Sequence, residues 1–197
     1  MDQYLLKIDP EICCLDNQML WHTLAERVFR DWQESPNDLN RLLVCGTQLW
    51  YMLELDEYLR LDSNPPEEFE SICAETVSHR LQEVVSYGLA HFSDNAPFNA
   101  YFGYLFKVKP EYFVTKTSGY LYWYEKGISM IKKAHELDPN SPFTRALYYQ
   151  LEAYGINEAC REIWEQITPA QWGQTNFHCY MFSILWGDNF YPDAYST

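Results

Sequence analysis

Apolar residues recur with the period of an α-helix along nearly the whole chain. Leu20, Leu24 and Val28 show this spacing in the first clear segment, at about residues 17–34, and similar segments follow as far as about Gly187. No segment alternates convincingly between apolar and polar residues, so "YLLKI", residues 4–8, is the only candidate strand. The pattern therefore predicts an all-α protein of about eight helices.

Short polar segments that contain proline separate the expected helices. In "SPND" (35–38), Ser35 can cap a helix, Pro36 suits a first turn and Asp38 interacts favourably with the helix dipole. The segments "DSNPPEE" (62–68), "SDNAP" (93–97) and "DPNSP" (138–142) repeat this chemistry. The expected helices span about residues 17–34, 39–61, 69–91, 96–109, 119–137, 142–154 and 157–167, and an eighth follows the cap at 168–172 and ends near 187.

These short connections predict that successive helices pack as antiparallel pairs. At 197 residues the chain is long enough to bury a sizeable core. We expect a single helical domain, residues 1–197, which can be subdivided into N-terminal helices (1–94) and repeat-like helices (95–197).

The second half of the chain resembles a tetratricopeptide repeat. Gly127, Ile131, Ala134 and Pro139 match the small residue, bulky residue, alanine and helix-ending proline of the second helix in that family. The resemblance covers residues 98–169, with Gly103 at the small position of the preceding helix, but the first unit carries about a dozen extra residues between its helices. It implies helix pairs that approach closely at small residues and stack on their neighbours. A generic helical bundle with Asp-Pro turns is the alternative.

Composition limits the partners and the compartment. The formal net charge of −14 and the pI near 4.6 disfavour binding to a nucleic-acid backbone, and they favour a basic partner or simple solubility. No apolar run is long enough to span a membrane, and the N-terminus lacks the features of a secretory signal. Six cysteines without CxxC spacing are typical of reduced thiols. We therefore expect a cytoplasmic protein with no nucleic-acid or membrane partner.

Catalytic motifs are scarce in the sequence. Glu75, His79 and Glu83 share one helical face and could hold a metal, but no second His or Cys lies near them, so we interpret them as a solvated face. His178 and Cys179 could form a nucleophile pair, and we interpret them as packed core residues. The sequence predicts no enzyme activity, no metal and no cofactor.

Negative charge is concentrated in residues 54–83, where nine acids face only two arginines. This stretch centres on the turn between the second and third expected helices, so we expect its acids to project from one end of the fold. The turn is either simply solvated or a docking surface that speeds encounter with a cationic partner. The acids predicted to bind that partner are Glu54, Asp56, Glu57, Asp62, Glu67, Glu68 and Glu70.

A second concentrated feature is "YLYWY", residues 120–124, which is aromatic at four of five positions. Its side chains point around most of a helix, so they cannot all face one core. We expect Tyr120, Tyr122, Trp123 and Tyr124 to contribute exposed anchors to a groove or interface. The stretch 98–133 combines lysines with aromatics, as single-strand nucleic-acid sites do, but it lacks arginine.

In size, acidity and aromatic content the chain resembles the immunity proteins of bacterial contact-dependent growth inhibition systems, whose toxins are often nucleases. The resemblance implies one-to-one binding of a basic toxin nuclease domain, whose active-site cleft an acidic surface would occlude. The alternative is an adaptor or chaperone that holds an extended peptide in a concave groove between Tyr101 and Tyr154. An enzyme that uses His178–Cys179 or the Glu75–His79 face is the third class.

Overall fold

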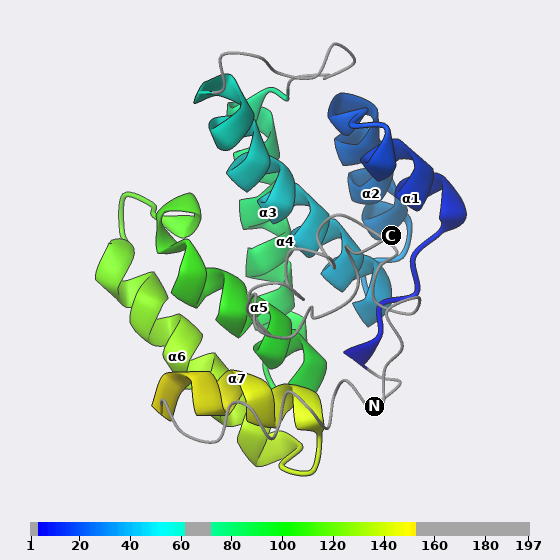
Figure 1. Cartoon of the computed structure of the whole chain (residues 1–197). Coiled ribbons are helices and arrows are strands. Elements are labelled where there is room, and N and C mark those ends of the chain that lie inside the picture. Colours follow the sequence, from blue (N-terminus) through cyan, green and yellow to red (C-terminus); the bar gives the residue numbers. More distant parts are fainter. Residues whose placement is uncertain (1–3, 62–71, 153–197) are drawn as a thin grey trace, which may run out of the picture.

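The computed structural model describes residues 4–61 and 72–152 of the chain. These residues form seven α-helices and contain no strand, which confirms the all-α class (Figure 1). The elements are α1 (Pro10–Asn17), α2 (Trp21–Glu34), α3 (Leu39–Leu61), α4 (Ala74–His91), α5 (Ala96–Val108), the 3₁₀ helix η2 (Pro110–Phe113), α6 (Tyr120–Leu137) and α7 (Pro142–Glu152). The helices expected beyond residue 154 lie outside the described residues. Within the described part, no helix is long and apolar enough to cross a membrane.

The polar segments at 35–38, 93–97 and 138–142 separate helices as the sequence predicts. The segment at 62–68 lies outside the described residues, and α4 begins at Ala74 rather than near residue 69. The side chain of Asn95 caps α5 by accepting a hydrogen bond from the Phe98 N–H at 3.0 Å. Between α6 and α7, the Thr144 hydroxyl donates to the carbonyl oxygen of Asp138 at 2.6 Å, which ties the first turn of α7 to the end of α6. Side-chain chemistry within a few residues of each break therefore accounts for these boundaries.

The N-terminal region differs from the expectation. A separate helix, α1, begins where Asp9 accepts a hydrogen bond from the Glu11 N–H at 2.8 Å and Pro10 occupies the first helical position. The helical backbone does not continue from α1 into α2, because Met19 lies between them with a φ of 56°, which is in the left-handed region. As a result α2 begins at Trp21 rather than near residue 17.

Residues 4–8 are not a strand. The side-chain amide of Asn40 accepts a hydrogen bond from the Lys7 N–H and donates one to the Lys7 carbonyl oxygen, both at 2.8 Å. Tyr4 is fully buried, and its carbonyl oxygen accepts a hydrogen bond from the Tyr101 hydroxyl at 2.6 Å. Side chains of α3 and α5 therefore hold this segment in place without a sheet.

Helix α5 is the centre of the fold. Every residue from Pro97 to Phe106 is buried. Figure 1 shows α5 between α6 on one side and α3 with α4 on the other. The phenyl rings of Phe102 and Phe98 lie against Gly46 of α3 and Gly88 of α4. The buried apolar side chains of the described residues form one core that both halves of the chain share, whereas a single domain for all 197 residues stays a prediction.

Helices α5 and α6 approach each other closely at two glycines. A Cβ atom on Gly127 would lie 2.6 Å from the backbone nitrogen of Lys107 and 2.7 Å from the carbonyl oxygen of Gly103. Contacts that short are not tolerated, so any side chain at position 127 would push the two backbones apart. The tetratricopeptide resemblance implies such an approach for one helix pair, whereas repeat-like stacking of successive pairs stays a prediction.

Substituting Gly127 tests this packing. Gly127→Ala is expected to lower the free energy of unfolding by about 1–3 kcal/mol, because the added methyl group must displace the backbone of α5. Urea unfolding of the full chain measures the change. The control is Gly119→Ala, because a Cβ atom there meets no atom within 4 Å; its effect should stay within about 1 kcal/mol. Equal stability of the two variants would contradict the close approach.

Candidate partner-binding surface

Exposed apolar side chains gather at one corner of the described structure. Among the described residues five large apolar side chains are exposed, and four of them belong to the loop before α6 and to the first turn of α6. These four are Val114, Tyr120, Leu121 and Tyr122, which we call the aromatic corner. Leu121 is 63% exposed, and the two tyrosines are each more than half exposed. Gathered apolar exposure of this kind is typical of interaction sites.

The helix period decides which aromatic side chains of residues 120–124 reach the surface. Trp123 lies on the buried face, because it packs 4.8 Å from the ring of Phe106 and donates its indole N–H to Ser118 Oγ at 3.0 Å. It is 8% exposed, so the expectation of an exposed anchor is wrong for Trp123. Tyr124 is half-buried, and its ring lies parallel to that of Tyr120 with 6.4 Å between the centroids.

The acids that are predicted to bind a partner are also not all at the surface. Asp56 is 3% exposed, and its Oδ1 atom accepts a hydrogen bond from the Ile72 N–H at 3.4 Å. The expectation that Asp56 projects into solvent is therefore wrong, because the helix period places it on the same face as the buried Leu49 and Leu53. Four further predicted acids lie outside the described residues: Asp62, Glu67, Glu68 and Glu70.

The two remaining acids, Glu54 and Glu57, converge on one hydroxyl group. The Tyr112 hydroxyl lies 2.9 Å from Glu54 Oε2 and 3.2 Å from Glu57 Oε2, and it can donate its proton to either carboxylate. Burial, followed by these two glutamates, raises the pKa of Tyr112, so the hydroxyl keeps its proton and remains a donor. Glu54 also pairs with Lys109 Nζ at 2.9 Å. Glu57 is exposed and, within the described residues, makes no ion pair.

Sequence reasoning missed Tyr112 and Lys109 as part of this surface. It treats the connection between α5 and α6 as a loop, whereas Pro110–Phe113 forms the 3₁₀ helix η2. Proline at the first position of η2 is the local signal that could have indicated it. Through Tyr112, η2 joins the acidic end of α3 to the aromatic corner, because Val114 follows Tyr112 by two residues.

A hollow of about 360 Å³ adjoins this junction. It lies between α3, α4 and η2, and we call it the α3–α4 socket. Its lining is mostly apolar and consists of Leu53, Asp56, Glu57, Ala74, Ser78 and Tyr112. The socket therefore places a cavity beside the exposed carboxylate of Glu57, and Tyr112 in its lining is close in the chain to the aromatic corner.

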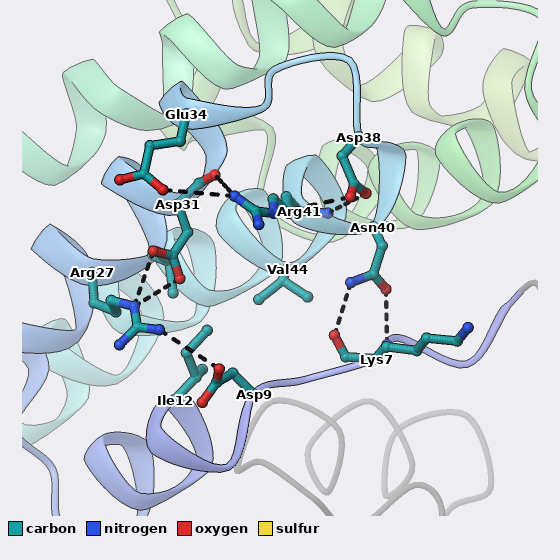
Figure 2. Close-up of a pocket in the computed structure, with 11 residues that line it drawn as sticks. Lys7, Asp9, Ile12, Arg27, Asp31, Glu34, Asp38, Asn40, Arg41 and Val44 are labelled. Atoms are coloured by element: carbon teal, nitrogen blue, oxygen red, sulfur yellow. Dashed lines mark hydrogen bonds and ion pairs between the residues drawn. The ribbon is translucent and has the colours of Figure 1, made fainter.

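A second cavity, of about 300 Å³, lies between the N-terminal segment, α1, α2 and α3. Figure 2 shows Arg27 directed toward Asp31 and Asp9, and Arg41 directed toward Asp38 and Glu34, whereas the Lys7 side chain points away from them. Arg27 pairs with Asp31 at 2.8 Å, with Asp9 at 3.6 Å and with Glu11, and the hydrogen bond to Asp31 is the main reason that the pKa of Arg27 is raised. Arg41 donates to the carbonyl oxygen of Asp31 at 2.8 Å. Because these charges compensate one another, the cleft ties α1, α2 and α3 together, and we interpret it as structural.

The candidate metal and nucleophile groups make no assembled site in the described structure. His79 Nδ1 lies 3.0 Å from Glu83 Oε1, and both side chains are exposed. Glu75 is also exposed. In residues 4–61 and 72–152, no three His, Cys, Asp or Glu side chains are arranged to hold a metal ion. His178 and Cys179 lie outside the described residues.

No family model, no curated protein and no solved structure matches this chain. Function is therefore inferred from three neighbouring features of its own surface. These are the aromatic corner, the carboxylate of Glu57 and the α3–α4 socket.

Two adjacent aromatic residues provide a test of the division between core and surface. Trp123→Ala is expected to lower the free energy of unfolding by about 3 kcal/mol or more, because it leaves a cavity beside Phe106. Tyr122→Ala should change it by less than about 1 kcal/mol, because the ring of Tyr122 is mostly in solvent. Urea unfolding followed by far-ultraviolet circular dichroism compares the two. Similar losses for both variants would show that the burial assigned to Trp123 is wrong.

Proposed function

We propose that the protein is an immunity protein that binds one basic toxin nuclease domain and occludes its active-site cleft. One observation supports this proposal above the others: exposed aromatic side chains follow η2 in the chain, and Tyr112 of η2 contacts Glu57, an exposed carboxylate that has no ion pair among the described residues. Buried aromatic anchors supply most of the binding energy in many protein interfaces, and unpaired charges steer the encounter. The aromatic corner and Glu57 supply these two components, and Tyr112 of η2 connects them.

The charge distribution favours a basic partner. Residues 1–91 contain seventeen acids and six basic residues, whereas residues 92–152 contain six acids and seven basic residues. The excess negative charge therefore belongs to the part of the chain that includes α1 to α4. A nuclease cleft is positively charged because it holds phosphates, so an acidic surface can enter it and exclude nucleic acid.

A second candidate function is a tetratricopeptide-like adaptor that binds an extended peptide. The close pairing of α5 and α6 at Gly103 and Gly127 favours it, because paired helices of that kind form the walls of peptide grooves. Tyr101 and Tyr104, however, are buried, so they cannot line such a groove. An adaptor would have to use aromatic side chains further along the chain, such as the half-buried Tyr148.

Affinity capture from the host lysate, followed by growth assays, tests the immunity function. The tagged protein is expected to retain one basic protein at equal stoichiometry and to release it at high salt. Expression of that protein alone should stop growth, and co-expression of the two should restore growth. Capture of many unrelated proteins with shared peptide segments would favour the adaptor instead. A captured protein that is harmless to the cell would contradict the immunity function.

Variants of the aromatic corner locate the interface. Tyr120→Ala combined with Tyr122→Ala should weaken binding of the captured protein by about thirtyfold or more, because two exposed anchors are lost while the core is intact. The matched control is Leu137→Ala, which truncates an exposed apolar side chain at the opposite end of α6. Equal affinities for the two variants would exclude the aromatic corner as the interface.

A further inference from the structure

The α3–α4 socket differs from the charged cleft in how its carboxylates are compensated. In the cleft, Arg27 pairs with Asp31, and Arg41 pairs with Glu34 and Asp38 (Figure 2). In the socket, no basic side chain is among the lining residues that the structure describes. Lys109 forms an ion pair with Glu54 at 2.9 Å, and it interacts with Glu57 only at longer range. Among the described residues the rim of the socket is therefore negative, and no basic side chain forms an ion pair with Glu57 there.

The walls of the socket are suited to an apolar chain. Leu53 and Ala74 face it from α3 and α4, and the Tyr112 side chain closes it from η2. The Tyr112 hydroxyl is directed to Glu54 and Glu57, so it adds no unpaired polar group to these walls. The C-terminal end of α3 favours a cation, the N-terminal end of α4 opposes one, and these two dipoles largely cancel. The carboxylate of Glu57 consequently decides the sign of the charge that the socket accepts.

We propose that the socket binds a lysine or arginine side chain of the partner protein, an inference that rests on the proposed function. The apolar stem lies along Leu53, Ala74 and the Tyr112 ring, and the cationic head reaches the carboxylate of Glu57. Long basic side chains bury their stems against apolar surface and keep their charged heads near water, which matches a shallow socket with an acidic rim. A purely apolar side chain would desolvate Glu57 without compensation, and an acidic one would be repelled.

Nα-acetyl-lysine methylamide is the direct probe of the socket. In the full-length protein it should produce saturable NMR shifts at the methyl group of Ala74 and the ring of Tyr112. The norleucine analogue has the same stem without the charge, and it should bind about fivefold more weakly or worse. Saturation by both compounds at the same concentration, or by neither, would overturn the inference.

Three variants distinguish binding in the socket from long-range attraction of the probe by the net negative charge of the protein. Glu57→Gln should weaken binding of the lysine compound by about fivefold. Glu75→Gln removes the same charge from an exposed residue that does not line the socket, and it should weaken binding by less than about twofold. Ala74→Leu keeps the charge, fills the socket and should abolish the saturable shifts. Equal effects of Glu57→Gln and Glu75→Gln would show that the field, rather than the socket, attracts the probe.

Binding of the captured protein distinguishes failure of the socket from failure of the function. If Glu57→Gln and Ala74→Leu bind that protein as tightly as the wild type, while the double tyrosine variant does not, the socket inference is wrong and the immunity proposal stands. If the lysine compound binds the socket but no toxic protein is captured, the cation site stands and the immunity proposal fails. Thermal unfolding of each variant verifies that an intact fold is being compared.

Discussion

The contact between the backbones of α5 and α6 at Gly103 and Gly127 determines how this side of the fold is arranged. With one face against α6 and the other against α3 and α4, α5 has no surface left to expose. Helix α6 is therefore an outer helix that has one buried face. Trp123 lies on that face four residues before Gly127, so its neighbours in the first turn must point outward. The aromatic corner is thus a consequence of how closely two helices pack.

Some acidic side chains form ion pairs within the protein, and others remain available to a partner. Asp9, Glu11 and Asp31 surround Arg27, and Glu54 is paired with Lys109. Such pairs stabilise the positions of helices, although exposed ones contribute little to the free energy of unfolding. Among the described residues Glu57 forms no ion pair, and its side chain is exposed. An exposed carboxylate without an ion pair contributes little to the free energy of unfolding, but it can attract a cationic group of a partner to an interface.

The central position of α5 also bears on the choice between a toxin inhibitor and a peptide-binding adaptor. An adaptor needs side chains that face a groove, and the aromatic residues of α5 instead fill the core between layers of helices. What α5 contributes is rigidity, because its packing holds η2 and the start of α6 in fixed positions. Exposed side chains held on packed helices suit insertion into the cleft of a folded partner better than enclosure of a flexible peptide.

The sequence by itself determined the helices, since apolar period and capping by residues such as Asn95 act within a few positions along the chain. It also identified Tyr120 and Tyr122 as residues that could reach a partner. It misassigned Trp123 and Asp56, because an aromatic or acidic run does not state which of its members face the core. Only the tertiary structure decided that Tyr112 meets Glu54, 58 residues away, and that Glu57 lies beside a socket without an ion pair among the described residues. Burial and charge compensation depend on contacts between distant segments, and no local pattern encodes them.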